Sequence, residues 1–184
     1  MAGGDAVPVQ VRALQIDQES GQAVLLLEAS DGRQLAIAIG IAEATSIAKE
    51  LEGLDLPRPL SHDLLRNVIE ELGGGVERVE ITSLRENTYY ATLVLQHAEE
   101  RRSGLDCRPS DAIAVAVRFG APILVHASVL AEAGSDPAAA EDGDSEAEPE
   151  DRAQAREVPL PTDKEAWKKL LREMDPKDFG RYKI

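Results

Sequence analysis

The sequence predicts an α+β fold made of a duplicated unit of three strands and two helices. Two observations predict it. Apolar residues alternate with a strand period in some stretches and with a helix period in others. The domain also matches itself at one constant shift of 68 residues, with no gap, across three strands and a helix. We therefore expect one copy at about residues 7–73 and a second at about 75–133.

The first copy opens with strands. Apolar residues alternate at positions 7, 9, 11 and 13, and the alternation then shifts by one residue to 14 and 16. This shift predicts a strand with a bulge or an end near Ala13. Residues 23–27 are continuously apolar, as in a strand buried on both faces, and Asp31-Gly32 turns the chain into a strand at 35–39. A helical period then runs from Ile41 until Gly53. Ser61 is expected to cap a second helix with an inward apolar face, formed by Leu64, Leu65, Val68, Ile69 and Leu72.

The second copy repeats this order. Three strands are predicted, at residues 76–84, 89–96 and 104–107, and Glu86-Asn87 is expected to form the turn between the first two. The helix that follows has Pro109 at its first position and Gly120 after its end. It is apolar on every side from Ala112 to Val117, so we expect protein to cover it all round. A last, short helix would begin near Ser128.

Charge separates a domain, residues 1–133, from the rest of the chain. Residues 131–151 carry nine acidic residues and no basic one, so 134–158 is predicted to be an acidic disordered linker. Residues 159–184 are predicted to form an amphipathic helix and tail, whose apolar stripe should dock on a surface: Trp167, Leu170, Leu171 and Met174. The net charge of −14 argues against a broad surface for non-specific nucleic-acid binding.

The remaining composition predicts a cytoplasmic protein. The single cysteine, Cys107, excludes an intramolecular disulfide, and the start of the chain lacks an export signal. No segment has the length and apolarity of a membrane span, so no membrane partner is expected. Cys107 alternates with Leu105 in an inward pattern and is best explained as a small core residue, although Arg108 beside it leaves a nucleophile open. The apolar strands and the helix at 112–117 favour a homodimer.

Two segments resemble a known family. Arg108-Pro-Ser-Asp-Ala-Ile-Ala114 and Arg58-Pro-Leu-Ser-His-Asp-Leu-Leu65 are similar to the most recognisable stretches of the bifunctional nuclease domain family, which occurs in bacteria and plants. The similarity runs from about residue 7 to about 130, and Met174-Asp-Pro-Lys-Asp-Phe179 is similar to the closing segment of many members. The resemblance implies a single barrel-like sheet with helices around it, and a nuclease acting on RNA, DNA or both.

The candidate site residues follow from the same segments. Glu43 and Asp111 occupy equivalent positions in the two copies, each at a helix start, and could share a divalent ion, or each could only complement its helix dipole. With Asp63, they form the predicted set of metal ligands. His62 is the candidate for proton transfer, or else a solvated first-turn residue. Arg108 would contact a phosphate, or pair with Asp111 or Asp106.

The predicted function is a nuclease in which Asp111, His62 and Arg108 are catalytic and Mg²⁺ or Mn²⁺ is the cofactor. No organic cofactor is expected, because phosphate-binding loops and dinucleotide fingerprints are absent from the sequence. Nucleic acid would be a substrate and not a tight non-specific ligand. The alternative is a non-catalytic, oligomeric binding or regulatory module whose C-terminal helix engages a protein partner.

Overall fold

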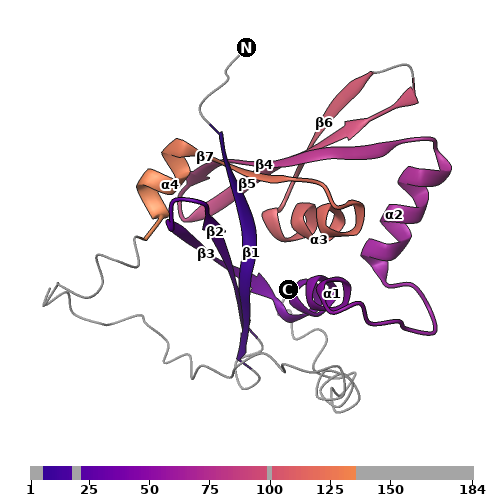
Figure 1. Ribbon diagram of the computed structural model, residues 1–184, viewed down its shortest axis with the longest axis horizontal. Helices are drawn as coiled ribbons and strands as arrows, with labels where there is room; N and C mark the ends of the chain where they lie inside the picture. The colour runs from indigo at the N-terminus through magenta and orange to yellow at the C-terminus, as the bar shows by residue number, and fades with distance from the viewer. Residues whose placement is uncertain (1–5, 18–21, 99–100, 136–184) are drawn as a thin grey trace, which may run out of the picture.

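The computed structural model describes residues 6–17, 22–98 and 101–135, which form one curled, seven-stranded sheet with four helices packed around it (Figure 1). The sheet is a half-barrel with mixed strand directions. The predicted α+β class and single sheet are thereby confirmed. The acidic linker and the C-terminal helix predicted from the sequence lie outside the described residues, except for Gly134 and Ser135.

The strand order places the two halves of the domain on either side of one short central strand. In chain order the strands are β1 (Ala6–Asp17), β2 (Gln22–Ala29), β3 (Gln34–Gly40), β4 (Gly75–Arg85), β5 (Thr88–Gln96), β6 (Arg102–Cys107) and β7 (Ile123–His126). Their spatial order is β3-β2-β1-β7-β4-β5-β6. β7 pairs antiparallel with β1 and parallel with β4, and the other pairs are antiparallel.

Local features of the strands follow the sequence, with one exception. The register of β1 against β2 shifts between Val11 and Ala13, which confirms the predicted bulge. Glu86 and Asn87 both have positive φ, as the tight turn between β4 and β5 requires. Burial along β2 alternates, so the prediction of burial on both faces was wrong: Val24 and Leu26 are only half-buried. They lie on the face of β2 opposite the buried side chains of Leu25 and Leu27.

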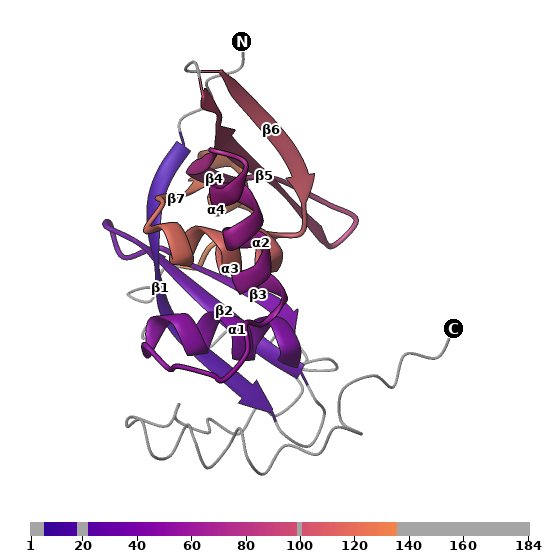
Figure 2. The ribbon, with the colours of Figure 1, turned by 90° about the vertical axis from the view of Figure 1, so that its right-hand side faces the viewer.

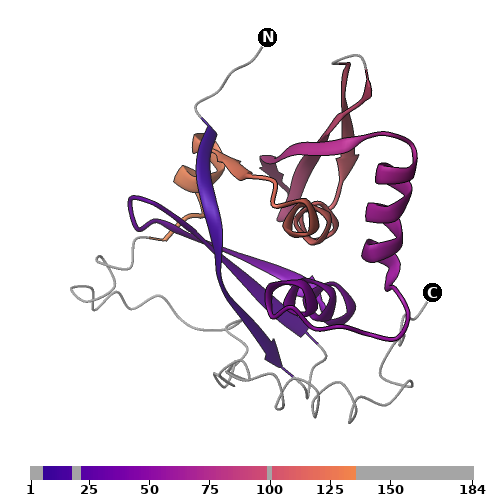
Figure 3. The ribbon, with the colours of Figure 1, turned by 45° about the vertical axis from the view of Figure 1, so that its right-hand side comes forward.

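The helices are α1 (Ile41–Leu51), α2 (Ser61–Glu71), α3 (Pro109–Phe119) and α4 (Ala127–Ala133). α1 and α3 pack against each other between the two wings of the sheet, and α4 lies on the other side of β1 (Figure 3). Residues 112–116 are at most 3% exposed, so the prediction that protein covers α3 is confirmed. In the part of the chain described, no helix is long and apolar enough to cross a membrane.

α2 differs from the prediction. It packs mainly against α3 and lies in front of it, facing the viewer, in Figure 2, so only a narrow strip that includes His62 and Ile69 turns inward. The four other apolar residues predicted to face the core are exposed: Leu64, Leu65, Val68 and Leu72. Ser61 is not the N-cap. Leu60 precedes the helix, and Asp63 Oδ2 accepts a hydrogen bond from the Leu60 amide at 2.8 Å.

From β1 to α1 and from β4 to α3, the order of elements is the one that the 68-residue shift predicts. α1 and α3 have equal lengths, and α3 begins 68 residues after α1. Each helix follows three antiparallel strands, and the sheet order runs outward from β7 in the same sequence on both sides. β7 itself has no counterpart strand among the described residues of the first half. Duplication of one ancestral unit stays a prediction.

Candidate functional site

Four of the five predicted site residues line one pocket, where the N-terminal ends of α1, α2 and α3 approach each other. Glu43 comes from the first turn of α1, His62 from α2, and Asp111 from α3. Arg108 is the residue at which β6 passes into α3. The pocket has a volume of about 540 Å³, and its other lining residues are mostly apolar or small: Ala42, Thr45, Ser46, Leu56, Leu60, Ser61 and Leu65.

Arg108 joins the two acidic residues of the pocket. Its Nε donates to Asp111 Oδ2 at 2.7 Å, and its Nη2 donates to Asp111 Oδ1 at 3.0 Å and to Glu43 Oε1 at 2.6 Å. The hydrogen bonds to Asp111 and Glu43 raise the pKa of Arg108 against the opposing effect of its burial, so it stays charged. The Arg108 side chain is 63% exposed, whereas that of Glu43 is 12% exposed. The guanidinium therefore forms the solvent-facing edge of the site.

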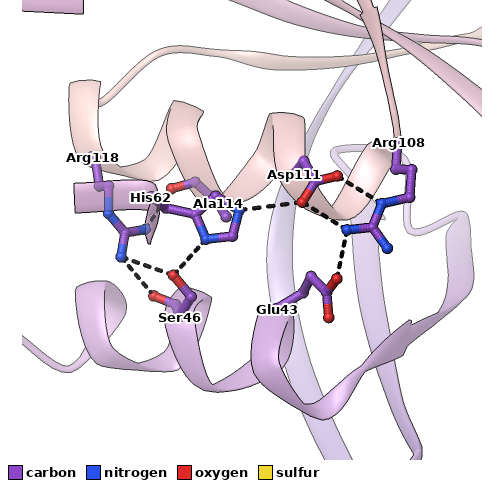
Figure 4. A network of polar contacts seen from close by, with 7 residues as sticks. All are labelled: Glu43, Ser46, His62, Arg108, Asp111, Ala114 and Arg118. Carbon is purple, nitrogen blue, oxygen red and sulfur yellow. Dashed lines mark hydrogen bonds and ion pairs between the residues drawn. The ribbon is translucent and has the colours of Figure 1, made fainter. Parts of the chain in front are cut away.

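His62 lies behind Asp111 and is buried. Its Nε2 is 3.2 Å from Asp111 Oδ1, and its Nδ1 is 2.9 Å from Ser46 Oγ (Figure 4). Burial raises the pKa of Asp111, but the hydrogen bonds from Arg108 and His62 outweigh it and hold the pKa below its usual value. Asp111 is thus an ionised carboxylate that only accepts hydrogen bonds.

For a neutral His62, the Asp111 carboxylate fixes the tautomer, because it only accepts and therefore requires the proton on Nε2. Arg118 donates through Nη2 to Ser46 Oγ at 3.0 Å, and an arginine can only donate. A neutral His62 with its proton on Nε2 donates to Asp111 and accepts the Ser46 hydroxyl proton at Nδ1. Every hydrogen bond from Arg118 through Ser46 and His62 to Asp111 then has one donor and one acceptor. This assignment gives a continuous polar chain from the core to the pocket.

Arg118 and Ser46 were missed by the sequence reasoning. The Arg118 side chain is fully buried, and it donates to Asp63 Oδ1 at 2.8 Å, to the Ala114 carbonyl at 2.6 Å and to the Ser46 carbonyl at 3.1 Å. A single arginine in an apolar, covered helix is the signal that was available, because such a charge needs buried partners. Ser46 offered a weaker signal, because it is a hydroxyl residue on α1 whose burial was not evident from the sequence.

The structure does not bring Asp63 into the pocket. Asp63 Oδ1 accepts hydrogen bonds from Lys49 Nζ at 3.1 Å and from Arg118, and Oδ2 accepts from the amide of Leu60. Burial raises the pKa of Asp63, but these hydrogen bonds have the larger effect and hold the pKa below its usual value. Asp63 lines a separate depression between α1, α2 and their connection, together with Lys49 and Arg66.

The donor set of the pocket suits one type of metal site. Within the described residues, no three His, Cys, Asp or Glu side chains lie close enough together to hold an ion. Glu43 and Asp111 nevertheless share one positive group, the guanidinium of Arg108. Mg²⁺ is commonly held by one or two carboxylates that are completed by water and substrate phosphate. The two acids fit this arrangement and not a cage built from protein alone.

Cys107 lies beside the pocket residues but packs against the hydrophobic core. Burial raises the pKa of its thiol, and the nearby Asp111 and Asp106 carboxylates act in the same direction. A raised pKa disfavours the thiolate that a nucleophile needs. The geometry favours the interpretation of Cys107 as a small core residue.

Together, these features define an α+β half-barrel domain with an Arg-Asp-His cluster in a pocket at its helix starts. Residues 24–138 match the bifunctional nuclease domain. The chain belongs to the bifunctional nuclease domain family, as its two similar segments predicted.

Named relatives extend this comparison. An uncharacterized protein from Mycobacterium tuberculosis is 45% identical over 127 residues, which make up 68% of this chain and 75% of that protein. Bifunctional nuclease 1 from Oryza sativa subsp. japonica is 32% identical over 119 residues, 62% of this chain and 36% of the plant protein. Bifunctional nuclease 2 from Arabidopsis thaliana is 28% identical over 106 residues, 55% of this chain and 32% of that protein.

Proposed function

We propose that this chain is a nuclease that hydrolyses phosphodiester bonds of RNA, DNA or both in the pocket at the starts of α1, α2 and α3. The observation that carries the proposal is the meeting of Arg108, Glu43, Asp111 and His62 in that one pocket. The names of the plant relatives, at 28% and 32% identity, support the same activity.

Arg108 is the proposed phosphate contact. A guanidinium presents donors in a planar fork that matches two phosphate oxygens. Arg108 uses Nε and Nη2 for Asp111 and Glu43, and its side chain is mostly exposed at the edge of the pocket. A phosphate that approaches from solvent would therefore meet this side chain before the less exposed carboxylates.

Glu43 and Asp111 are the proposed ligands of a divalent cation, Mg²⁺ or Mn²⁺. Two carboxylates and one guanidinium leave the pocket with an excess of negative charge, which repels a polyanion unless a further cation is bound. A cation on these two residues would neutralise phosphate charge and polarise the bond to be cleaved. Asp63 is not included in this proposal, because it lies outside the pocket and lines the separate depression with Lys49 and Arg66.

His62 is the proposed proton-transfer residue. Its Nδ1 is held by Ser46, and its Nε2 is turned toward Asp111 and Arg108 (Figure 4). With its proton on Nε2, it would give that proton to the leaving oxygen, either directly or by way of the Asp111 carboxylate. Ser46 and Arg118 act on this step only by positioning the ring.

The first prediction tests this function with the purified full chain. We expect cleavage of single-stranded RNA or DNA with Mg²⁺ or Mn²⁺, and loss of cleavage in EDTA. Asp111→Asn keeps the size of the side chain but removes its charge, so turnover should fall about 100-fold or more. Circular dichroism should show an unchanged fold. The matched control is Asp106→Asn, the same substitution at an exposed position outside the pocket, which should cleave like the parent protein.

Two results would contradict the proposal in different ways. Equal cleavage by a folded Asp111→Asn protein would remove this residue from the active site. No cleavage with any divalent metal would favour the second candidate function, a non-catalytic binding or regulatory module. That candidate is favoured by the exposed apolar face of α2, which is typical of a surface that contacts protein.

A further inference from the structure

We propose that the C-terminal segment, residues 159–179, docks along the exposed apolar face of α2 in the same molecule. This face, the α2 stripe, consists of Leu64, Leu65, Val68 and Leu72. The proposal concerns an intramolecular interaction surface and is independent of nuclease activity.

The α2 stripe is an unusual surface for this domain. Leu64 is 56% exposed and Leu72 is 80% exposed, while Leu65 and Val68 lie between them and are also exposed. Residues 64, 68 and 72 are spaced by four and therefore form one row along the helix. A contiguous apolar row of this kind on a domain surface indicates a contact site. On α2 the exposed Glu70 and Glu71 outnumber the one arginine, Arg66, which pairs with Glu70, so the polar rim next to the stripe is acidic.

The C-terminal segment has the complementary pattern. Trp167, Leu170, Leu171 and Met174 follow the spacing of a single helical face. Residues 164–172 also carry four basic residues and one acidic residue, in a chain with a net charge of −14. An apolar stripe with basic neighbours would therefore meet an apolar stripe with acidic neighbours. A second copy of α2 would instead bring like charges together, since a twofold contact pairs a surface with itself.

The connection is long enough for this contact. Ser135 pairs with Gln34 at the start of β3, and residues 136–158 separate it from the segment. Fully extended, these residues span at most about 80 Å, whereas a domain of this size has a radius of gyration of roughly 14 Å. A tethered segment is also presented at an effective concentration on the order of millimolar, which favours it over a second molecule in dilute solution.

The test uses Trp167, the only tryptophan in the chain, as an internal reporter. In the full chain, its fluorescence emission should be blue-shifted and shielded from acrylamide. The double substitution Leu64→Gln/Val68→Gln should shift the emission to the red and raise the quenching constant severalfold. Both positions are exposed, so the fold should persist. Leu72→Gln, at the exposed end of α2, should give the same change to a smaller extent. The control Leu105→Gln replaces a leucine that is 49% exposed on β6 and should leave the emission unchanged.

Three results would overturn the proposal. A solvent-like Trp167 emission in the parent chain would show that the segment does not dock. A shielded Trp167 that ignores the α2 substitutions would place the segment on another surface. Shielding that is lost on dilution would assign the stripe to a second molecule. Support requires shielding that persists on dilution and is lost in the α2 variants.

Discussion

Arg118 is the residue on which the polar network behind the pocket depends. Its donors reach α1 through Ser46, α2 through Asp63, and α3 through the Ala114 carbonyl, so one side chain connects three helices. A buried charge is costly unless it is paired and hydrogen-bonded, and Arg118 satisfies this condition. The same contacts orient Ser46 and, through it, His62. Stability and the geometry of the pocket therefore share one set of hydrogen bonds.

The second prediction concerns acid and Asp63, the anionic partner of Arg118. The pKa of Asp63 in the folded protein is below its ordinary value of 3.8, so its ionisation stabilises the fold fully above about pH 5 and progressively less as the pH falls through the folded pKa. We expect Asp63→Asn to lower the free energy of unfolding by about 2 kcal/mol near neutral pH. The difference from the parent should shrink below pH 3.8, where Asp63 also takes up a proton.

Urea unfolding between neutral and acidic pH measures this difference. Asp106→Asn is the control, because Asp106 is exposed and, in the described part of the chain, its side chain forms no hydrogen bond or salt bridge. Its unfolding should follow the parent protein at every pH. A difference between Asp63→Asn and parent that does not change with pH would show that the Asp63 charge is not the source of stability.

At the scale of the elements, most of the fold could be predicted because periodicity reports local structure directly. The bounds of α1 and α3, the bulge near Ala13 and the turn at Glu86-Asn87 all follow from spacing and turn chemistry. α2 was correctly predicted as a helix, but most of the apolar face that was predicted to point inward is exposed. A helical period shows that one face is apolar, and it does not show whether the chain itself or another surface covers that face.

The site was predictable to the extent that its residues stand in recognisable local positions. Glu43, Asp111 and Arg108 lie at helix starts, and His62 lies in a segment similar to the family. Asp63 has the same local appearance, yet its neighbours are Lys49 and Arg118, which lie 14 and 55 residues away in the chain. Contacts between distant residues have no signature in a single sequence. For the same reason, Ser46 could not be linked to His62.

The third prediction concerns the end of α3, on which the position of Arg118 depends. Gly120 follows the helix with φ of 61°, and a Cβ at this position would meet no atom within 4 Å. Gly120→Ala should therefore cost only the backbone strain of the left-handed conformation, about 1 kcal/mol. Gly75→Ala is the matched control, since Gly75 also has open space but no positive φ. It should be neutral or stabilise by up to about 0.5 kcal/mol in thermal unfolding. Equal effects at the two positions would contradict the assignment of strain to Gly120.

For the whole molecule, self-association stays a prediction, and the structure changes its reason. The apolar helix that suggested a dimer is α3, which the domain itself covers. Among the described residues, exposed apolar surface outside α2 includes Leu105 on β6, which is an edge strand of the sheet. An edge strand with unpaired backbone groups can pair with a second copy.

The fourth prediction is accordingly a dimer of the full chain in sedimentation velocity at micromolar concentration. Leu105→Lys should shift the protein toward monomer, because a charge at the centre of β6 opposes pairing of two copies. Leu105 is 49% exposed, so the fold should persist when its side chain is replaced. A parent protein that sediments only as a monomer would refute self-association.

The fifth prediction follows from the charge of the whole chain. With a net charge of −14, few basic residues are free to replace the counterions of a nucleic acid, and Arg108 is the one that the pocket supplies. Each phosphate contact contributes about −0.7 to the slope of log affinity against log salt for a single strand, so one to three contacts predict a slope no steeper than about −2.

The slope is measured as log kcat/KM against log KCl at saturating Mg²⁺. Arg108→Gln should lower kcat/KM and make the slope shallower by about 0.7, because one counterion is no longer released. A contaminating basic nuclease would show a slope of about −4 or steeper, unchanged by Arg108→Gln, and that result would remove the activity from this protein.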